Sequence, residues 1–152
     1  MLRVIVSYWN AKPFITTCLK SIAFQRYRDW TCVIFDDCST DKSYKKVARI
    51  IESDNRFSFV MNDKKYWQVG NWWQFHQRKD IDDSDIVITI DGDDWLPDFM
   101  VFDRIIETYS DNVTWVTYGN FLRKGRSRGQ TGYCRKVEYA AEIRNVYKKF
   151  RP

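Results

Sequence analysis

Ile-Val-Ile-Thr-Ile-Asp-Gly-Asp-Asp, residues 86–94, is the stretch that says most about this chain. Its apolar first half predicts a buried strand, and three carboxylates, Asp91, Asp93 and Asp94, follow within four positions. At an effective dielectric of about 20, two carboxylates about 5 Å apart repel by about 3 kcal/mol. A divalent cation with oxygen ligands would offset this charge, and Gly92 would let the backbone turn sharply enough to gather the acids. The alternative is a solvated acidic turn, because Asp and Gly are common loop residues.

Short apolar runs of this kind recur along the chain, and segments with helical spacing lie between them. Strands are expected over residues 4–8, 30–35, 57–61, 86–90 and 113–118. Helices are expected to begin at Asn10 as N-cap, at Asp41, at Val69 and at Pro97. Strands that alternate with helices indicate a mainly parallel sheet with helices on both faces. The sequence therefore predicts an α/β fold.

Length and composition favour one globular domain. The chain has 152 residues, of which 44% are apolar, and this is enough to bury a substantial core. It contains no run of 18 apolar residues, so no membrane span is expected, and Met1 leads almost directly into a strand without a signal-peptide pattern. The cysteines show no Cys-x-x-Cys spacing. We therefore expect a cytoplasmic protein.

The charge is distributed unevenly. Residues 1–122 hold 15 basic and 18 acidic side chains, whereas residues 123–152 hold 10 basic and 2 acidic ones. We expect residues 1–122 to form the core domain and residues 123–152 to form a basic loop and a C-terminal helix. A basic segment of this kind is also compatible with a nucleic-acid-binding module, although that alternative leaves the acids at 91–94 unexplained.

Polar residues follow three of the expected strands at the point where each strand ends. Tyr8-Trp9-Asn10 follows the first, residues 36–41 follow the second, and residues 91–94 follow the fourth. Ligands of open α/β sheets bind beyond the carboxyl ends of the strands, so these loops should face one crevice. There a carboxylate can bond a base, an aromatic ring can stack on it, and the last cluster can hold a metal against a diphosphate.

In order along the chain, these motifs resemble those of the metal-dependent glycosyltransferases of family 2, whose Rossmann-like fold is called GT-A. The resemblance covers roughly residues 3–122, and Asp91-Gly92-Asp93 looks like the DxD motif of that family. The other matching positions are Trp9-Asn10, the run Val33 to Asp41, Asn62, Gly70, Asn71 and Trp95-Leu96-Pro97-Asp98.

The resemblance implies transfer of a sugar, with inversion, from a nucleotide-sugar donor to a hydroxyl of a saccharide or other acceptor. A UDP-sugar is the first choice of donor, with Asp36 or Asp37 bonding the uracil. Mn²⁺ or Mg²⁺ would bridge the diphosphate and stabilise it as it departs. The implied metal ligands are Asp91, Asp93 and Asp94, and the implied donor-binding residues are Tyr8, Trp9, Asn10, Asp36, Asp37, Asn71, Asp91, Gly92 and Asp93.

The sequence departs from the family pattern after the metal motif. No Glu-Asp-like motif for a general base follows Asp94, and the later acids Glu138 and Glu142 are expected to be exposed helix residues. The chain thus looks like the N-terminal donor-binding part of a GT-A domain, with the acceptor side truncated or supplied by another chain, for example in a homo-oligomer. A Mg²⁺-dependent nucleotidyltransferase is a further alternative, but the Gly-rich phosphate loop usual in such enzymes is missing after the first strand.

Two kinds of side chain between the third and fourth strands have a less specific pattern. Lys64 and Lys65 could meet a phosphate, but a solvated loop is the expected role. Trp67, Trp72 and Trp73 could stack on a sugar, although a helix with adjacent tryptophans usually buries at least one of them.

Overall fold

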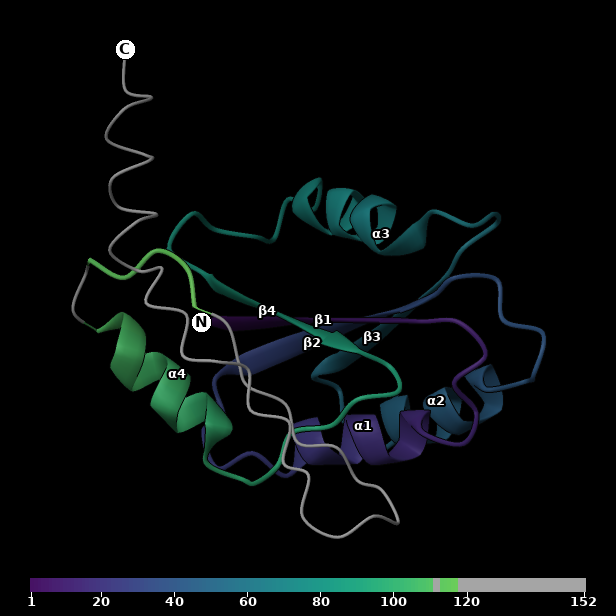
Figure 1. Ribbon diagram of the computed structural model, residues 1–152, viewed down its shortest axis with the longest axis horizontal. Coiled ribbons are helices and arrows are strands. Elements are labelled where there is room, and N and C mark those ends of the chain that lie inside the picture. The colour runs from purple at the N-terminus through teal and green to yellow at the C-terminus, as the bar shows by residue number, and fades with distance from the viewer. Residues whose placement is uncertain (111–112, 118–152) are drawn as a thin grey trace, which may run out of the picture. The chain divides into compact units, whose positions relative to one another are not determined.

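A four-stranded parallel sheet forms the centre of the structure, which is a computed structural model that describes residues 1–110 and 113–117 (Figure 1). The chain divides into two compact units, Met1–Asp111 and Asn112–Pro152, and the fold described here is that of the first. The strands are β1 (Leu2–Tyr8), β2 (Trp30–Asp36), β3 (Phe57–Met61) and β4 (Ile86–Asp91), in the spatial order β3-β2-β1-β4. This sheet confirms the predicted α/β class and four of the expected strands.

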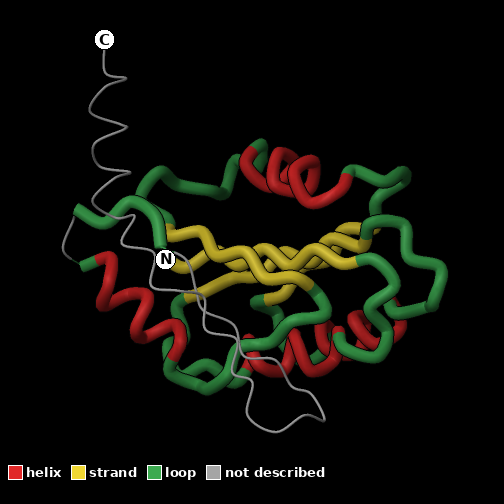
Figure 2. Tube along the Cα trace, viewed as in Figure 1, coloured by secondary structure: helices red, strands yellow, loops and turns green. Residues whose placement is uncertain are grey.

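Helices cover both faces of the sheet, as Figure 2 shows. In the described first unit, α3 (Trp67–His76) lies on one face, and α1 (Ile15–Ala23), α2 (Tyr44–Ile51) and α4 (Val101–Tyr109) lie on the other. Helices on both faces require strands that are apolar on both sides, and the burial of β1 and β2 along nearly their whole length meets that requirement. None of the described helices combines the length and apolar character needed to span a bilayer.

Alternate residues of the strands point to opposite faces of the sheet and contribute to two separate hydrophobic cores. The larger core packs one strand face against α1, α2 and α4, with Val4, Ile34, Leu19 and Phe102 among its buried side chains. The smaller core packs the opposite face, including Ile5, Val33 and Phe35, against Phe75 of α3. The period of two along each strand therefore separates the helices onto the two faces.

Within the described residues, α1, α2 and α4 begin later than the sequence suggests, whereas α3 begins at Trp67, two residues before the expected Val69. Asn10 does not cap α1, because its φ is 52° and α1 begins five residues further on. Asp41 and Asp98 instead accept backbone hydrogen bonds from Ser43 and Met100, in turns that precede α2 and α4. Short polar side chains favour such local turns as much as they favour caps, and the sequence pattern does not separate the two.

The prediction of a fifth strand over residues 113–118 is wrong for the five residues that the structure describes. Residues 113–117 form no strand, and Trp115 and Val116 are largely exposed. Apolar and β-branched residues favour strands, but this preference depends on packing in the folded protein, which composition does not reveal. The predicted basic loop and C-terminal helix within residues 123–152 lie outside the described residues.

Candidate functional site

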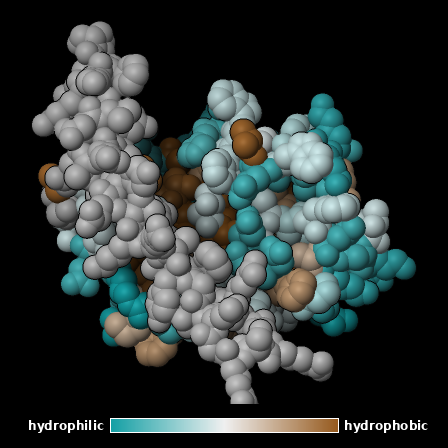
Figure 3. Space-filling view, viewed as in Figure 1, coloured by the Kyte–Doolittle hydropathy of each residue, from teal (hydrophilic) through white to brown (hydrophobic). Residues whose placement is uncertain are grey.

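The carboxyl ends of β1, β2 and β4 lie level with one another at one edge of the sheet. In the register of the sheet, Tyr8 pairs with Asp36, and Ser7 pairs with Asp91. The loops that follow these strands therefore lie beyond one edge, and hydrophilic side chains predominate on that side of the molecule (Figure 3). The predicted convergence of the three polar clusters at this edge is confirmed.

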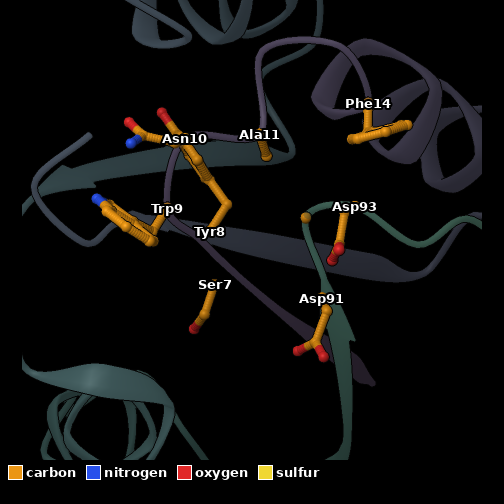
Figure 4. A pocket seen from close by; sticks show the side chains of 9 residues that line it. Ser7, Tyr8, Trp9, Asn10, Ala11, Phe14, Asp91 and Asp93 are labelled. Carbon is orange, nitrogen blue, oxygen red and sulfur yellow. The ribbon is translucent and has the colours of Figure 1, made fainter. Parts of the chain in front are cut away.

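A pocket of about 200 Å³ opens between the ends of β1 and β4. Figure 4 shows the Trp9 ring on one side of it and the carboxylates of Asp91 and Asp93 on the other. Its lining comprises Ser7, Tyr8, Trp9, Asn10, Ala11, Phe14, Asp91, Gly92 and Asp93. Six of the residues implied to bind the donor thus meet in one place, whereas Asp36, Asp37 and Asn71 are outside the lining.

Gly92 allows β4 to come unusually close to β1. A Cβ atom at this position would lie 2.3 Å from Cβ of Tyr8 and 3.3 Å from Cδ1 of Ile15. The backbone N–H of Gly92 also donates a hydrogen bond of 3.0 Å to the carbonyl of Ser7. A glycine is therefore required here for close approach, and this approach places the acids beside the β1 loop.

The acidic turn, which we define as Asp91, Asp93 and Asp94, carries negative charge that the described residues do not neutralise. Partial withdrawal from water, and then the charges of Asp93 and Asp94, raise the pKa of Asp91. Gln68 of α3 donates a hydrogen bond of 2.8 Å to Oδ1 of Asp91 and so orients this carboxylate, but an amide brings no positive charge. Among the described residues, no positive side chain therefore forms an ion pair with the acidic turn.

The acidic turn does not form a complete metal cage by itself. Within residues 1–110 and 113–117, no three His, Cys, Asp or Glu side chains converge closely enough to hold a metal ion. Asp94 is outside the pocket lining, and its N–H closes the turn by donating to the carbonyl of Asp91. Mg²⁺ and similar ions are commonly held by one or two carboxylates together with substrate phosphates, and Asp91 and Asp93 fit that mode. A metal role for the three aspartates stays a prediction.

Cys18 lies directly beneath the acidic turn. Burial, followed by the charges of the turn, raises the pKa of this thiol to about 12. The protonated thiol faces the carbonyl of Asp91, with 3.7 Å between Sγ and the oxygen. Cys18 therefore supports the turn as a buried, neutral side chain.

Asp36 and Asp37 form hydrogen bonds inside the protein. Asp36 is buried and accepts from the Tyr8 hydroxyl at 2.9 Å and from the Ser39 N–H at 2.8 Å. Asp37 accepts from the N–H groups of Tyr66 and Trp67 at 2.8 and 3.1 Å, and from the side chain of Asn62. These contacts fix the loops around the pocket, and the predicted bond of one of these acids to a uracil stays a prediction.

The start of α3 is held in an unusual conformation by Asp37. Trp67 has a φ of 59°, in the left-handed region that bulky residues rarely adopt. The hydrogen bond from its N–H to Asp37 stabilises this conformation. Asn71, one turn further along α3, is buried, and its carbonyl oxygen accepts from Asn62 at 2.7 Å. Asn71 therefore belongs to the polar support of α3 beside the pocket.

The β1 loop and the β2 loop are joined by side-chain contacts. Oδ1 of Asn10 accepts from the N–H of Thr40 at 2.8 Å, and the N–H of Asn10 donates to Oγ of Ser39 at 2.9 Å. These hydrogen bonds use the backbone N–H and the side-chain oxygen of Asn10. The neighbouring Trp9 is 55% exposed at the pocket. An exposed aromatic ring is suited to the planar part of a ligand, whereas the acidic turn beside it would accept an anionic part only together with a bound cation.

Two residues near the site were not predicted to have a role there. Gln68 orients Asp91, and the ammonium of Lys65 lies 3.4 Å from the centroid of the Trp9 ring. Lys65 precedes α3 and Gln68 lies in its first turn, and the packing of α3 over the sheet brings both residues close to the pocket. The sequence offers no local signal for either contact, because each partner is more than 20 positions away in the chain.

The chain matches Glycosyl transferase family 2 over residues 3–151, and it belongs to that family. It is 41% identical over 64 residues to the teichoic acid poly(glycerol phosphate) polymerase of Staphylococcus epidermidis, a match over 41% of this chain. It is 24% identical over 131 residues to the glycosyltransferase GlyA of Streptococcus pneumoniae, over 84% of this chain. These matches span 9% and 18% of the length of the two curated relatives.

Solved structures share the GT-A fold. TarS of S. aureus in complex with UDP-GlcNAc superposes with a TM-score of 0.59 at 19% identity, over 72% of this chain and 31% of that one. The mannosyltransferase PcManGT of Pyrobaculum calidifontis, in complex with GDP-Man and Mn²⁺, gives a TM-score of 0.61 at 23% identity, over 72% and 32%. The predicted GT-A fold is thus confirmed, and the family selects the glycosyltransferase interpretation over both alternatives.

Proposed function

We propose that this chain binds a nucleoside-diphosphate sugar, foremost a UDP-sugar, in the pocket between β1 and β4. As part of a glycosyltransferase it would transfer the sugar, with inversion, to a hydroxyl of a saccharide or other acceptor. The observation that carries this proposal is the meeting of the exposed Trp9 ring and the carboxylates of Asp91 and Asp93 in one pocket. TarS and PcManGT, which share the fold, are described with UDP-GlcNAc and with GDP-Man and Mn²⁺.

The residues of the acidic turn fit a divalent cation. Partial burial, and then the charges of Asp93 and Asp94, raise the pKa of Asp91, and a cation would offset that charge; the carboxylates of Asp91 and Asp93 are hard oxygen ligands. When bound there, Mn²⁺ or Mg²⁺ would stabilise the negative charge of the departing nucleoside diphosphate. Gln68 would keep the Asp91 carboxylate in one orientation, so that little ordering is required when the donor arrives.

The other lining residues supply shape and stacking. Trp9 offers a face to the base, with the ring placed by the loop that Asn10 joins to Ser39 and Thr40. Tyr8 is fixed by its hydrogen bond to Asp36, and burial, together with that carboxylate, raises its pKa well above the usual value. Tyr8 is therefore a neutral wall of the pocket. The general base stays unassigned, because the acids that line the pocket, Asp91 and Asp93, belong to the acidic turn.

The test is titration calorimetry of the 152-residue chain with UDP, with and without Mn²⁺. We expect UDP to bind in the presence of Mn²⁺ and to lose most of its affinity without it. Asp93→Asn should abolish the dependence on Mn²⁺, because it replaces one of two charged carboxylate ligands by a neutral amide. Asp83→Asn is the matched control, since it removes the same charge from an exposed residue before β4, at the opposite end of the strand. Mn²⁺-dependent UDP binding that survives in Asp93→Asn would contradict the metal assignment.

A further inference from the structure

Lys65 lies beside two exposed tryptophans, and one of them, Trp9, lines the pocket. Its ammonium lies 3.4 Å from the ring centroid of Trp9 and 5.1 Å from that of Trp67. The two rings are 55% and 67% exposed, so neither is a core residue. Trp9 lines the pocket, and the ammonium of Lys65, which is not itself a lining residue, lies over one face of its ring.

The position of Lys65 is set by the segment that follows it. The carboxylate of Asp37 accepts the N–H groups of Tyr66 and Trp67, which fixes the backbone next to Lys65. None of the ion pairs found in the described part of the chain involves Lys65. In the absence of ligand, its charge is therefore offset by ring faces and solvent.

We propose that Lys65, in addition to the metal, makes the site prefer a nucleoside diphosphate over the bare nucleoside. In the ligand-free protein its ammonium occupies a face of Trp9, and an incoming base takes that face. The displaced ammonium, on its long flexible side chain, then pairs with the diphosphate beside the acidic turn. This inference rests on the proposed function, because it requires a base and a diphosphate in the same pocket.

The order of interaction strengths supports this exchange. Stacking of a base on an aromatic side chain is stronger than a cation–π contact at an exposed site, so the base displaces the ammonium. A Lys ammonium gains more from a phosphate than from a ring, because the hydrogen bond is charge-assisted on both sides. A nucleoside loses the contact between Lys65 and Trp9 without replacement, whereas a nucleoside diphosphate replaces it with a stronger one.

The experiment compares Lys65→Met with Lys64→Met. Methionine keeps a long unbranched side chain and removes the charge. Lys64 is the matched control, because it is the adjacent residue with the same charge, and its ammonium lies 5.3 Å from the ring of Tyr66, which does not line the pocket. For each variant and the parent, calorimetry measures the dissociation constants of uridine and of UDP with Mn²⁺.

We expect Lys65→Met to change the two affinities in opposite directions. UDP binding should weaken about tenfold, as for loss of one charge-assisted hydrogen bond. Uridine binding should strengthen about two- to fivefold, because the base no longer displaces a cation from Trp9. Lys64→Met should leave the ratio of the two constants within about twofold of the parent.

Three results would overturn the inference. Equal weakening of uridine and UDP would mean that Lys65 merely supports the ring from its outer side. Unchanged binding of both ligands would mean that Lys65 does not act at the pocket. The same change of the two dissociation constants in Lys64→Met would mean that the effect comes from the net charge of the protein. If the parent itself fails to bind UDP with Mn²⁺, the proposed function fails, whereas parent binding with an unaltered Lys65→Met removes only this inference.

Discussion

Replacing Gly92 by alanine tests the close approach that builds the pocket. The added Cβ would lie 2.3 Å from Cβ of Tyr8, whereas two carbon atoms in contact are about 3.5–4.0 Å apart. Rotation of a side chain cannot relieve this overlap, because Cβ of Tyr8 is fixed to the β1 backbone. The turn after β4 must therefore move away from β1 by about an ångström or more.

Overpacking of this kind costs about 1–3 kcal/mol. In a unit the size of Met1–Asp111, we expect the melting temperature of Gly92→Ala to fall by about 5–15 °C, measured by circular dichroism. The shift should also weaken UDP binding with Mn²⁺, since it moves Asp91 and Asp93 relative to Trp9. Both effects can be measured on the same preparation.

Gly70→Ala serves as the graded control. Its added Cβ would lie 2.8 Å from Cβ of Tyr66, a smaller overlap, and alanine regains about 1 kcal/mol of helix propensity within α3. The loss of melting temperature should therefore be clearly smaller than for Gly92→Ala. If Gly92→Ala melted with the parent and bound UDP normally, the argument that a tight β1–β4 contact shapes the site would be refuted.

Three further variants test the polar contacts around the pocket and the sheet. Asp37→Asn should lower the free energy of unfolding by about 1–3 kcal/mol without any ligand, because an NH₂ group replaces one of the carboxylate oxygens that accept from the backbone at the start of α3. An unchanged midpoint of urea unfolding would contradict this structural role. The raised pKa of Asp91 means that the folded protein disfavours the charged form, so this residue's contribution to stability falls as pH rises through its pKa. Asp91→Asn should therefore raise the melting temperature at neutral pH but not near pH 3. Equal shifts of the melting temperature at both pH values would exclude this explanation. Asp85→Ala should lower the free energy of unfolding by about 3 kcal/mol, because it removes the carboxylate that lies 2.7 Å from the largely buried Arg3 side chain. If urea unfolding showed a loss below about 0.5 kcal/mol, the pair would behave as an exposed ion pair.

The sheet and the acidic turn were predictable because their signals are local. Each strand is a short apolar run that ends in polar residues, and alternation with helices suffices to predict a parallel sheet. Once the strands are parallel, their carboxyl ends must meet, so the assignment of Trp9 and Asp93 to one pocket followed from topology. No side-chain contact had to be known.

The roles of the remaining polar residues depend on contacts between distant segments. Asp37 is followed by a loop in the sequence, but its carboxylate is used by backbone groups about 30 positions later, at the start of α3. Asn10 is of a residue type that often caps helices, yet its side chain accepts a hydrogen bond from the N–H of Thr40 in a different loop. The sequence favours a solvated loop for Lys65 and gives no sign of its contact with Trp9, which lies 56 positions earlier. Such pairings emerge only when the packed elements are placed in space.

The position of β1 between β2 and β4 fixes a length scale for any ligand that reaches both neighbouring loops. Adjacent strands are about 4.8 Å apart, so the ends of β2 and β4 are held about 10 Å from each other by two rungs of backbone hydrogen bonds. The backbone ladder, rather than any one side chain, thus acts as a ruler. A substitution in either loop can change the side chains that a ligand meets, but it leaves the spacing of the strand ends unchanged.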